Sequence, residues 1–138
     1  MEGRNFIEWT DKEFSINNDI LDAQHKGFVK MINDIFNNIN LIDRSKEFEY
    51  FECVKEDISN YLKIHFYTEE KIMGKLNICK ELVKAHIKEH DKFIENFDMI
   101  IKNFKKEDLN LDELVFFLID WIADHVQTID KKTFKEVN

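Results

Sequence analysis

Two pairs of metal-competent side chains stand out in the sequence, and the two members of each pair are four residues apart. His65 is followed by Glu69, and His86 is followed by His90. On an α-helix this spacing leaves two side chains about 40° apart around the axis and about 6 Å apart along it. Each pair could therefore bind one ion. Histidine is the commonest transition-metal ligand, and carboxylates are natural bridges between hard ions.

Three further candidates flank these pairs: His25 upstream, and His125 and Asp130 downstream. With them the candidate set uses all 5 histidines of the chain. A lone histidine on an apolar stripe is more often a core residue bonded to a backbone carbonyl than a ligand. Several buried imidazoles and carboxylates at one level of a fold favour a metal site, because burying them together without a cation is costly.

The composition excludes several classes of protein. The chain has 138 residues, of which 43% are apolar, and this suits a single domain over residues 1–138 with one core. It has no proline and only 3 glycines, which favours long helices over the tight turns of an all-β fold. The net charge of -8 argues against nonspecific binding to nucleic acid or to an anionic membrane.

Neither a membrane span nor a secretory signal is expected. No apolar run approaches the length of about 18 residues that a spanning helix needs, and the first residues lack the apolar core of a signal peptide. We therefore expect a cytoplasmic protein. Cys53 and Cys79 are expected about 30 Å apart, because a helix separates them, and are interpreted as free thiols.

Apolar residues at steps of three and four predict four long helices. The first begins at residue 18 or 19, the second follows the polar loop 37–45 and stops at Gly74, and the third begins near Asn77. Asn110 and Glu113 resemble a capping box that opens the fourth helix. The expected segments are an N-terminal arm at 1–17, a four-helix bundle at 18–130 and a C-terminal tail at 131–138.

Short connections favour an all-α, up-down-up-down antiparallel bundle. This topology brings the start of the first and third helices and the end of the second and fourth to one end of the molecule, which collects every candidate ligand in one layer. Asp130 fits this layer poorly, because on a regular helix it lies about 140° around the axis from His125 and would point away from the site. We therefore predict irregular backbone between Val126 and Asp130, such as a widened turn.

The donor set exceeds the needs of one ion, and a four-coordinate structural zinc would leave three groups idle. Histidine with carboxylate suits iron, so we expect two iron ions (Fe2+/Fe3+) that share both carboxylates and a bridging oxo or hydroxo group. With three histidines on one iron and two on the other, the first is six-coordinate and the second five-coordinate. One position then stays open for a small molecule.

The chain resembles the hemerythrin family, and within it the bacteriohemerythrins. The matching motifs are Asp22-Ala23-Gln24-His25, His65-Phe66 with Glu69-Glu70 and Met73, His86 with His90, Trp121 with His125 and Asp130, and Trp9 in the arm. The resemblance implies reversible dioxygen binding at the open iron. It also implies that His86, His90 and His125 hold the six-coordinate iron, that His25 and His65 hold the open one, and that Glu69 and Asp130 bridge them.

A dry cavity over the open iron would slow the oxidation of the irons, and four apolar residues are expected to line it: Phe28, Phe66, Trp121 and Ile122. The alternative for each is ordinary core packing. Gly27, inside the first helix, is interpreted as a point of close helix approach, because glycine there otherwise only costs stability.

Two enzyme classes are disfavoured by motif. Ferritin-like di-iron oxidases use Glu-x-x-His pairs, and no histidine here has Glu three residues before it. A zinc protease needs Glu directly after the first histidine of its pair, and Ile87 stands there.

Within the hemerythrin class several functions stay open. They are oxygen storage, transport or delivery, oxygen or redox sensing through a partner, and reduction of nitric oxide or peroxide. A chain that starts at Met1 without a signalling domain favours binding over sensing. Dioxygen is the expected partner, a protein acceptor of oxygen is possible, and the oligomeric state is not predicted.

Overall fold

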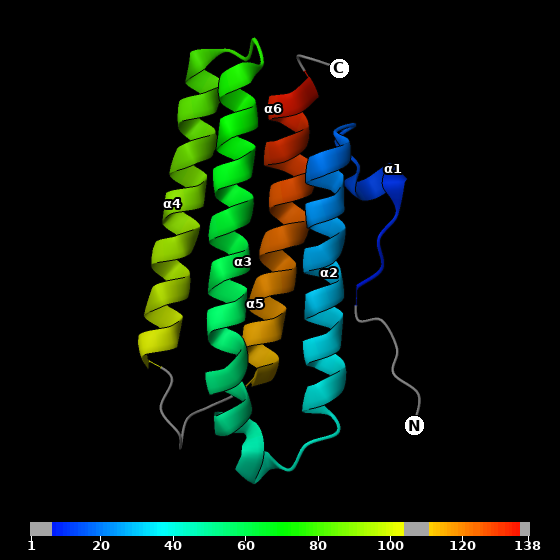
Figure 1. Cartoon of the computed structure of the whole chain (residues 1–138), viewed down its shortest axis with the longest axis vertical. Coiled ribbons are helices and arrows are strands. Elements are labelled where there is room, and N and C mark those ends of the chain that lie inside the picture. Colours follow the sequence, from blue (N-terminus) through cyan, green and yellow to red (C-terminus); the bar gives the residue numbers. More distant parts are fainter. Residues whose placement is uncertain (1–6, 104–110, 136–138) are drawn as a thin grey trace.

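The computed structural model describes residues 7–103 and 111–135, and helices are the only regular elements in those two ranges (Figure 1). Three rods consist of one helix each: α2 (Asp19–Ile39), α3 (Glu47–Lys75) and α4 (Lys80–Asn103). The fourth rod is α5 (Leu111–Asp124) continued by the π-helical turn η2 (His125–Asp130) and by α6 (Lys131–Lys135). Two short elements, α1 (Asp11–Phe14) and the 3-10 turn η1 (Arg44–Lys46), complete the order.

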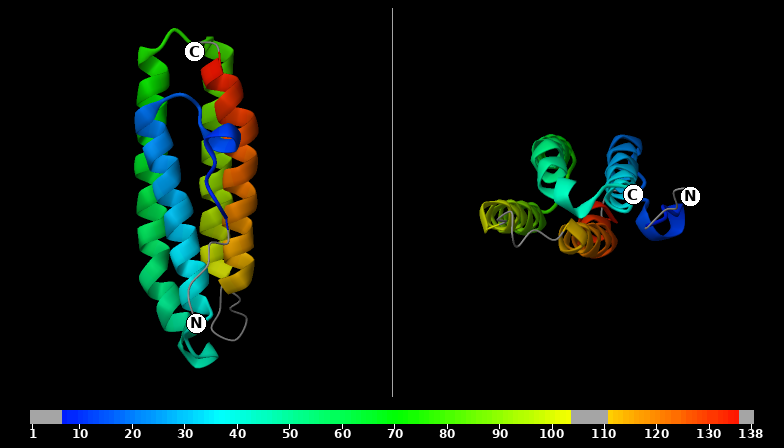
Figure 2. Two further views of the ribbon diagram at one scale, coloured as in Figure 1. Left: turned by 90° about the vertical axis from the view of Figure 1, so that its right-hand side faces the viewer. Right: turned by 90° about the horizontal axis from the view of Figure 1, so that it is seen from below.

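Successive rods run in opposite directions, and Figure 2 shows them side by side when the molecule is viewed along the bundle. Helix α2 packs against α3 and α5, and α3 packs against α4. The predicted up-down-up-down antiparallel bundle is therefore confirmed. As expected from this topology, the start of α2, the end of α3, the start of α4 and the η2 turn lie at the same end of the molecule.

The bundle is held together by one apolar core that runs through all four rods. Each long helix contributes a stripe at helical spacing, and the largest fully buried side chains are phenylalanines: Phe28, Phe51, Phe93, Phe97 and Phe134 are all at most 2% exposed. Aromatic packing ties α4 to α5, since the Phe93 and Phe117 rings stack with centroids 5.4 Å apart. This core fixes the rotation of each helix, and therefore the direction in which its polar residues point.

The described part of the N-terminal arm, residues 7–17, lies beside α2 (Figure 2). The side chain of Asn33 clamps it: the Ile7 amide donates to Asn33 Oδ1, and Asn33 Nδ2 donates to the Ile7 carbonyl. Asp22 holds the other end, because its carboxylate accepts from the Ile16 amide and the Ser15 hydroxyl. Asp22, part of the motif that suggested the family, thus positions the arm.

The helix ends differ in part from the predictions. Gly74 was expected to stop the second helix, but it lies inside α3 without the positive φ of a glycine cap, and the helix ends one residue later at Lys75. Helix α4 begins at Lys80, three residues after the predicted Asn77. Asn110, the proposed cap of α5, lies outside the described residues. Residues 131–135 of the segment assigned to a tail continue the fourth rod as α6, in which Thr133 and Phe134 are buried.

Two other predictions concern membrane-spanning helices and the two cysteines. Among the described residues, no helix is long and apolar enough to cross a membrane. Cys53 and Cys79 are both exposed free thiols, as expected.

Candidate metal centre

The seven predicted ligands converge inside the bundle. Helix α2 supplies His25, α3 supplies His65 and Glu69, α4 supplies His86 and His90, and η2 supplies His125 and Asp130. None of the seven residues is more than 3% exposed. The arrangement is the one that the alternating topology predicts, since each rod delivers its polar residues at the same level.

The predicted irregular backbone is present, because residues 125–130 form one π-helical turn. A π turn closes its hydrogen bonds over five residues, so residues five apart can point in the same direction. His125 and Asp130 accordingly face each other, with Nε2 of His125 3.0 Å from Oδ1 of Asp130. The turn brings the Asp130 carboxylate to the centre of the bundle.

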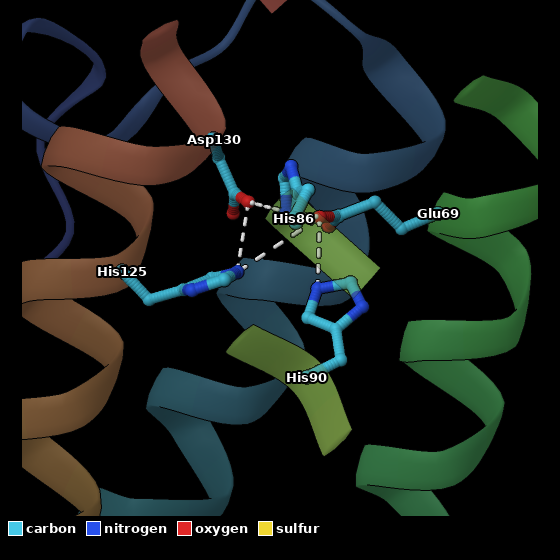
Figure 3. A group of neighbouring side chains, drawn as sticks. All are labelled: Glu69, His86, His90, His125 and Asp130. Atoms are coloured by element: carbon cyan, nitrogen blue, oxygen red, sulfur yellow. Dashed lines mark ion pairs between the residues drawn. The ribbon is translucent and has the colours of Figure 1, made fainter. Parts of the chain in front are cut away.

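Five of the residues form one compact group (Figure 3). Oε1 of Glu69 lies 2.5 Å from Nε2 of His86 and 3.3 Å from Nε2 of His90. Oδ1 of Asp130 lies 2.8 Å from the same His86 nitrogen and 3.0 Å from Nε2 of His125. One atom from each of the five residues lies within 4.8 Å of all the others, so the group could surround one ion.

His25 and His65 form a second, smaller group on the other side of the same carboxylates. Their Nε2 atoms are 3.1 Å apart, about the separation of neighbouring ligands that are each about 2.1 Å from one metal. Oε2 of Glu69 lies 3.1 Å from Nε2 of His65, and Oδ2 of Asp130 lies 3.2 Å from Nε2 of His25. Each carboxylate thus presents one oxygen to each group of histidines. This is the arrangement that two ions bridged by both carboxylates require.

Three histidines are oriented by a second contact through the other ring nitrogen. Nδ1 of His65 lies 2.7 Å from Oε1 of Gln24 and Nδ1 of His90 lies 2.9 Å from Oε2 of Glu70. Each partner is an oxygen that accepts a hydrogen bond, which favours the ring N–H on Nδ1 and leaves the Nε2 lone pair free to bind a metal. The third contact joins Nδ1 of His86 to the Thr133 hydroxyl, at 2.8 Å.

These orienting residues were not identified from the sequence. Gln24 and Glu70 are neighbours of ligands within the motifs, which is the only signal they carry. Thr133 carried none, because it lies in the segment that was expected to be a tail.

The buried polar atoms at the centre fit a metal pair. Several of them have no hydrogen-bond partner among the described residues: Nε2 of His86, His90 and His125, and both carboxylate oxygens of Glu69 and Asp130. Unpartnered buried polar atoms are costly, and groups that point at each other across a few ångströms are stabilised by a cation between them. Neutral imidazole with carboxylate is the donor set of transition-metal ions rather than of Mg2+ or Ca2+.

The pKa values of the site show how strongly the carboxylates attract positive charge. Burial alone would lower the pKa of His25, but the nearby carboxylates of Asp130 and Glu69 outweigh this effect and raise the pKa to about 9. The same balance raises the pKa of His86 to about 9. The facing histidines overcome the effect of burial on Asp130 and hold its pKa well below the usual range. The carboxylates therefore favour positive charge on His25 and His86 in the metal-free protein.

Aromatic rings pack on the ligand imidazoles. The Phe66 ring stacks on His90 with centroids 4.0 Å apart, and it also lies 5.7 Å from His65. Trp121 stacks on His125 with ring centroids 4.4 Å apart. The lining role expected of Phe66 and Trp121 stays a prediction. The ring of Trp9 in the arm lies 6.5 Å from the His25 ring, between centroids.

The other two predicted pocket residues are buried, Phe28 at 2% and Ile122 at 1% exposed. Phe28 stacks on Tyr61 with centroids 5.9 Å apart. Their lining role stays a prediction.

Comparison with known proteins agrees with this geometry. The family model described as the Hemerythrin HHE cation binding domain matches residues 17–137. The chain is 27% identical to the bacteriohemerythrin of Methylococcus capsulatus over 126 residues, which covers 91% of this chain and 92% of that relative. It is 28% identical to a bacteriohemerythrin of Pseudomonas aeruginosa over 90% of this chain and 76% of the relative.

Solved structures show the same similarity. A crystal structure of a hemerythrin mutant superposes with a TM-score of 0.77 at 28% identity, and covers 93% of this chain and 94% of its own. A wild-type hemerythrin structure gives a TM-score of 0.72 at 27% identity, over 91% of this chain and 93% of its own. With a family model that spans nearly the whole bundle and a buried histidine and carboxylate cluster able to bind metal, the chain belongs to the hemerythrin family.

Proposed function

We propose that the chain holds two iron ions and binds dioxygen reversibly, as an oxygen storage, transport or delivery protein. The observation that carries this proposal is the division of the donors by the two carboxylates. Three histidines face one oxygen of Glu69, while His25 and His65 lie nearer the other. One metal position is therefore richer in ligands than its neighbour.

The donor count supports an open position on the poorer side. His86, His90 and His125 with two carboxylate oxygens make five protein donors, while His25 and His65 with the remaining oxygens make four. A shared oxo or hydroxo group would add one donor to each ion. The His25 and His65 side then has room for one small ligand. Bound as Fe2+, the pair supplies the electrons that dioxygen takes up on binding and returns on release.

The chain's own residues protect and orient this centre. The Nδ1 contacts of His65, His86 and His90 fix their ring orientation and hold their Nε2 atoms toward the carboxylates. Phe66 and Trp121 cover the imidazoles of His90 and His125 with apolar surface, which limits the access of water. A dry site favours the release of neutral dioxygen over the loss of reduced oxygen.

The test is anaerobic reconstitution with Fe2+, followed by alternate exposure to air and argon. We expect two irons per chain by metal analysis and a visible spectrum that appears in air and disappears under argon over repeated cycles. A His65→Ala variant should keep its helical circular dichroism but hold less iron and lose the oxygen-dependent spectrum. A single irreversible oxidation in air would contradict reversible binding. Rapid turnover of nitric oxide or peroxide in stopped-flow experiments would favour the reductase alternative. Cytoplasmic location stays a prediction.

A further inference from the structure

We infer that the two metal positions fill in a fixed order. The group formed by Glu69, His86, His90, His125 and Asp130, here named the five-donor group, binds a divalent cation first and by itself. The position at His25 and His65, here named the two-histidine position, fills second and loses its ion first. This inference rests on the proposed metal site but does not depend on iron or on oxygen binding.

The first reason is the number of donors already in place. The five-donor group brings three imidazole nitrogens and two carboxylate oxygens within 4.8 Å of one another. At the two-histidine position, the donor atoms that lie this close together come from His25, His65 and Glu69. Asp130 contributes there through Oδ2, which lies 3.2 Å from Nε2 of His25. A single ion therefore gains more bonds in the five-donor group.

The second reason is the unequal support of the histidines. His86 and His90 each have an oxygen partner on Nδ1, and so does His65. Nδ1 of His25 is buried and has no hydrogen-bond partner among the described residues. Loss of such an outer contact typically weakens metal binding about 10–100-fold. His25 is therefore the least supported of these four ligands, and it belongs to the two-histidine position.

The third reason is charge. The carboxylates of Glu69 and Asp130 meet at the centre. Within the described residues, histidines are the only basic side chains that lie within 4.0 Å of them. One divalent cation between neutral imidazoles balances the two negative charges. A second divalent cation then enters a site that is already neutral and is repelled by the first, in surroundings that screen charge poorly. Binding of the second ion is weaker for this reason also.

The experiment is a titration of the metal-free protein with Zn2+ alone, followed by native mass spectrometry. Near one equivalent of Zn2+ we expect the one-metal species to dominate, and filling of the second position should require at least about tenfold more free Zn2+. A His25→Ala variant should keep the first binding step and lose the second. A His90→Ala variant is the matched change in the five-donor group, and it should weaken the first step.

The outcomes separate this inference from the proposed function. Zero-metal and two-metal species in equal amounts at one equivalent, with little one-metal species, would overturn ordered filling while leaving a two-metal site intact. Retention of the second step in His25→Ala, with loss of the first, would also overturn it. Failure of the wild-type chain to bind Zn2+ would overturn the metal site itself. Circular dichroism of each variant shows whether the bundle has folded.

Discussion

Nδ1 of His86 and the hydroxyl of Thr133 lie 2.8 Å apart, although 47 residues separate them in the chain. The contact joins the start of α4 to α6, the short helix that follows the π-helical turn. The turn that swings Asp130 into the site thus also determines where Thr133 lies. Helix α6 is therefore part of the structural support of the site.

Replacing Thr133 with Val should weaken metal binding. Val keeps the shape of Thr but cannot form a hydrogen bond with Nδ1 of His86, so the ring loses its orienting contact. We expect a loss of metal affinity of about 10–100-fold, measured by competition with a chelator. Thr133→Ser restores the hydroxyl and is the matched control. Equal affinities for the Val and Ser variants would show that the hydroxyl has no positioning role.

Gly27 is required by a side chain of the neighbouring helix. A Cβ at this position would collide with the hydroxyl of Tyr61, which donates a hydrogen bond to the Gln24 carbonyl at 2.5 Å. Gly27→Ala should therefore lower the free energy of unfolding by about 1–3 kcal/mol, despite the better helix propensity of alanine. Urea denaturation measures this change.

The control is Gly27→Ala made in a Tyr61→Phe background, because Tyr61→Phe removes the oxygen that clashes with the new Cβ. We expect the cost of Gly27→Ala to fall by at least about 1 kcal/mol in that background. An identical cost in both backgrounds would mean that the hydroxyl is not the obstacle.

Much of the site was predictable because its information is local. The spacing of His65 with Glu69 and of His86 with His90 sets two ligand pairs on helix faces, and alternating topology then brings them to one level. The misfit of Asp130 on a regular helix correctly indicated the π turn. These inferences need only helix geometry and the order of the elements.

The remaining features depend on how each helix is rotated against its neighbours. Thr133 meets His86 only because α6 continues past the π turn, and nothing in the local sequence indicates this. Trp121 packs between His125 and Phe93, and no local sequence pattern indicates either contact. A predicted close approach at Gly27 could not name Tyr61 as its partner. Long-range packing determines these contacts.

The stability of the metal-free protein should fall as the pH rises above neutrality. The folded-state pKa values of His25 and His86 are about 9, above the ordinary 6.5, so their stabilising contribution is complete below pH 6.5 and is lost as the pH rises through 9. His125 acts in the same direction, while the pKa of His65 is lowered, mainly by burial, and opposes them. Glu69 and Asp130, with lowered pKa values, contribute stability that is lost in acid.

The stabilisation that a bound metal adds should increase with pH, because the ion competes with protons for the same imidazoles. The rise in Tm that Zn2+ produces should therefore grow between about pH 5.5 and pH 8.5. Differential scanning calorimetry with and without Zn2+ measures both curves. Parallel curves would show that protons and metal do not share these ligands.

Phe66 should protect the iron centre against oxidation, because its ring contacts ligands of both groups, His90 at 4.0 Å and His65 at 5.7 Å. Phe66→Leu leaves the donors in place but uncovers part of this surface to water, so the oxygen-dependent spectrum should decay several times faster in air. Phe97→Leu is the control, since Phe97 is equally buried and stacks on Phe93. Both variants should lose similar stability in urea and keep the iron content of the wild type. Equal rates of spectral decay in the two variants would assign Phe66 to core packing alone.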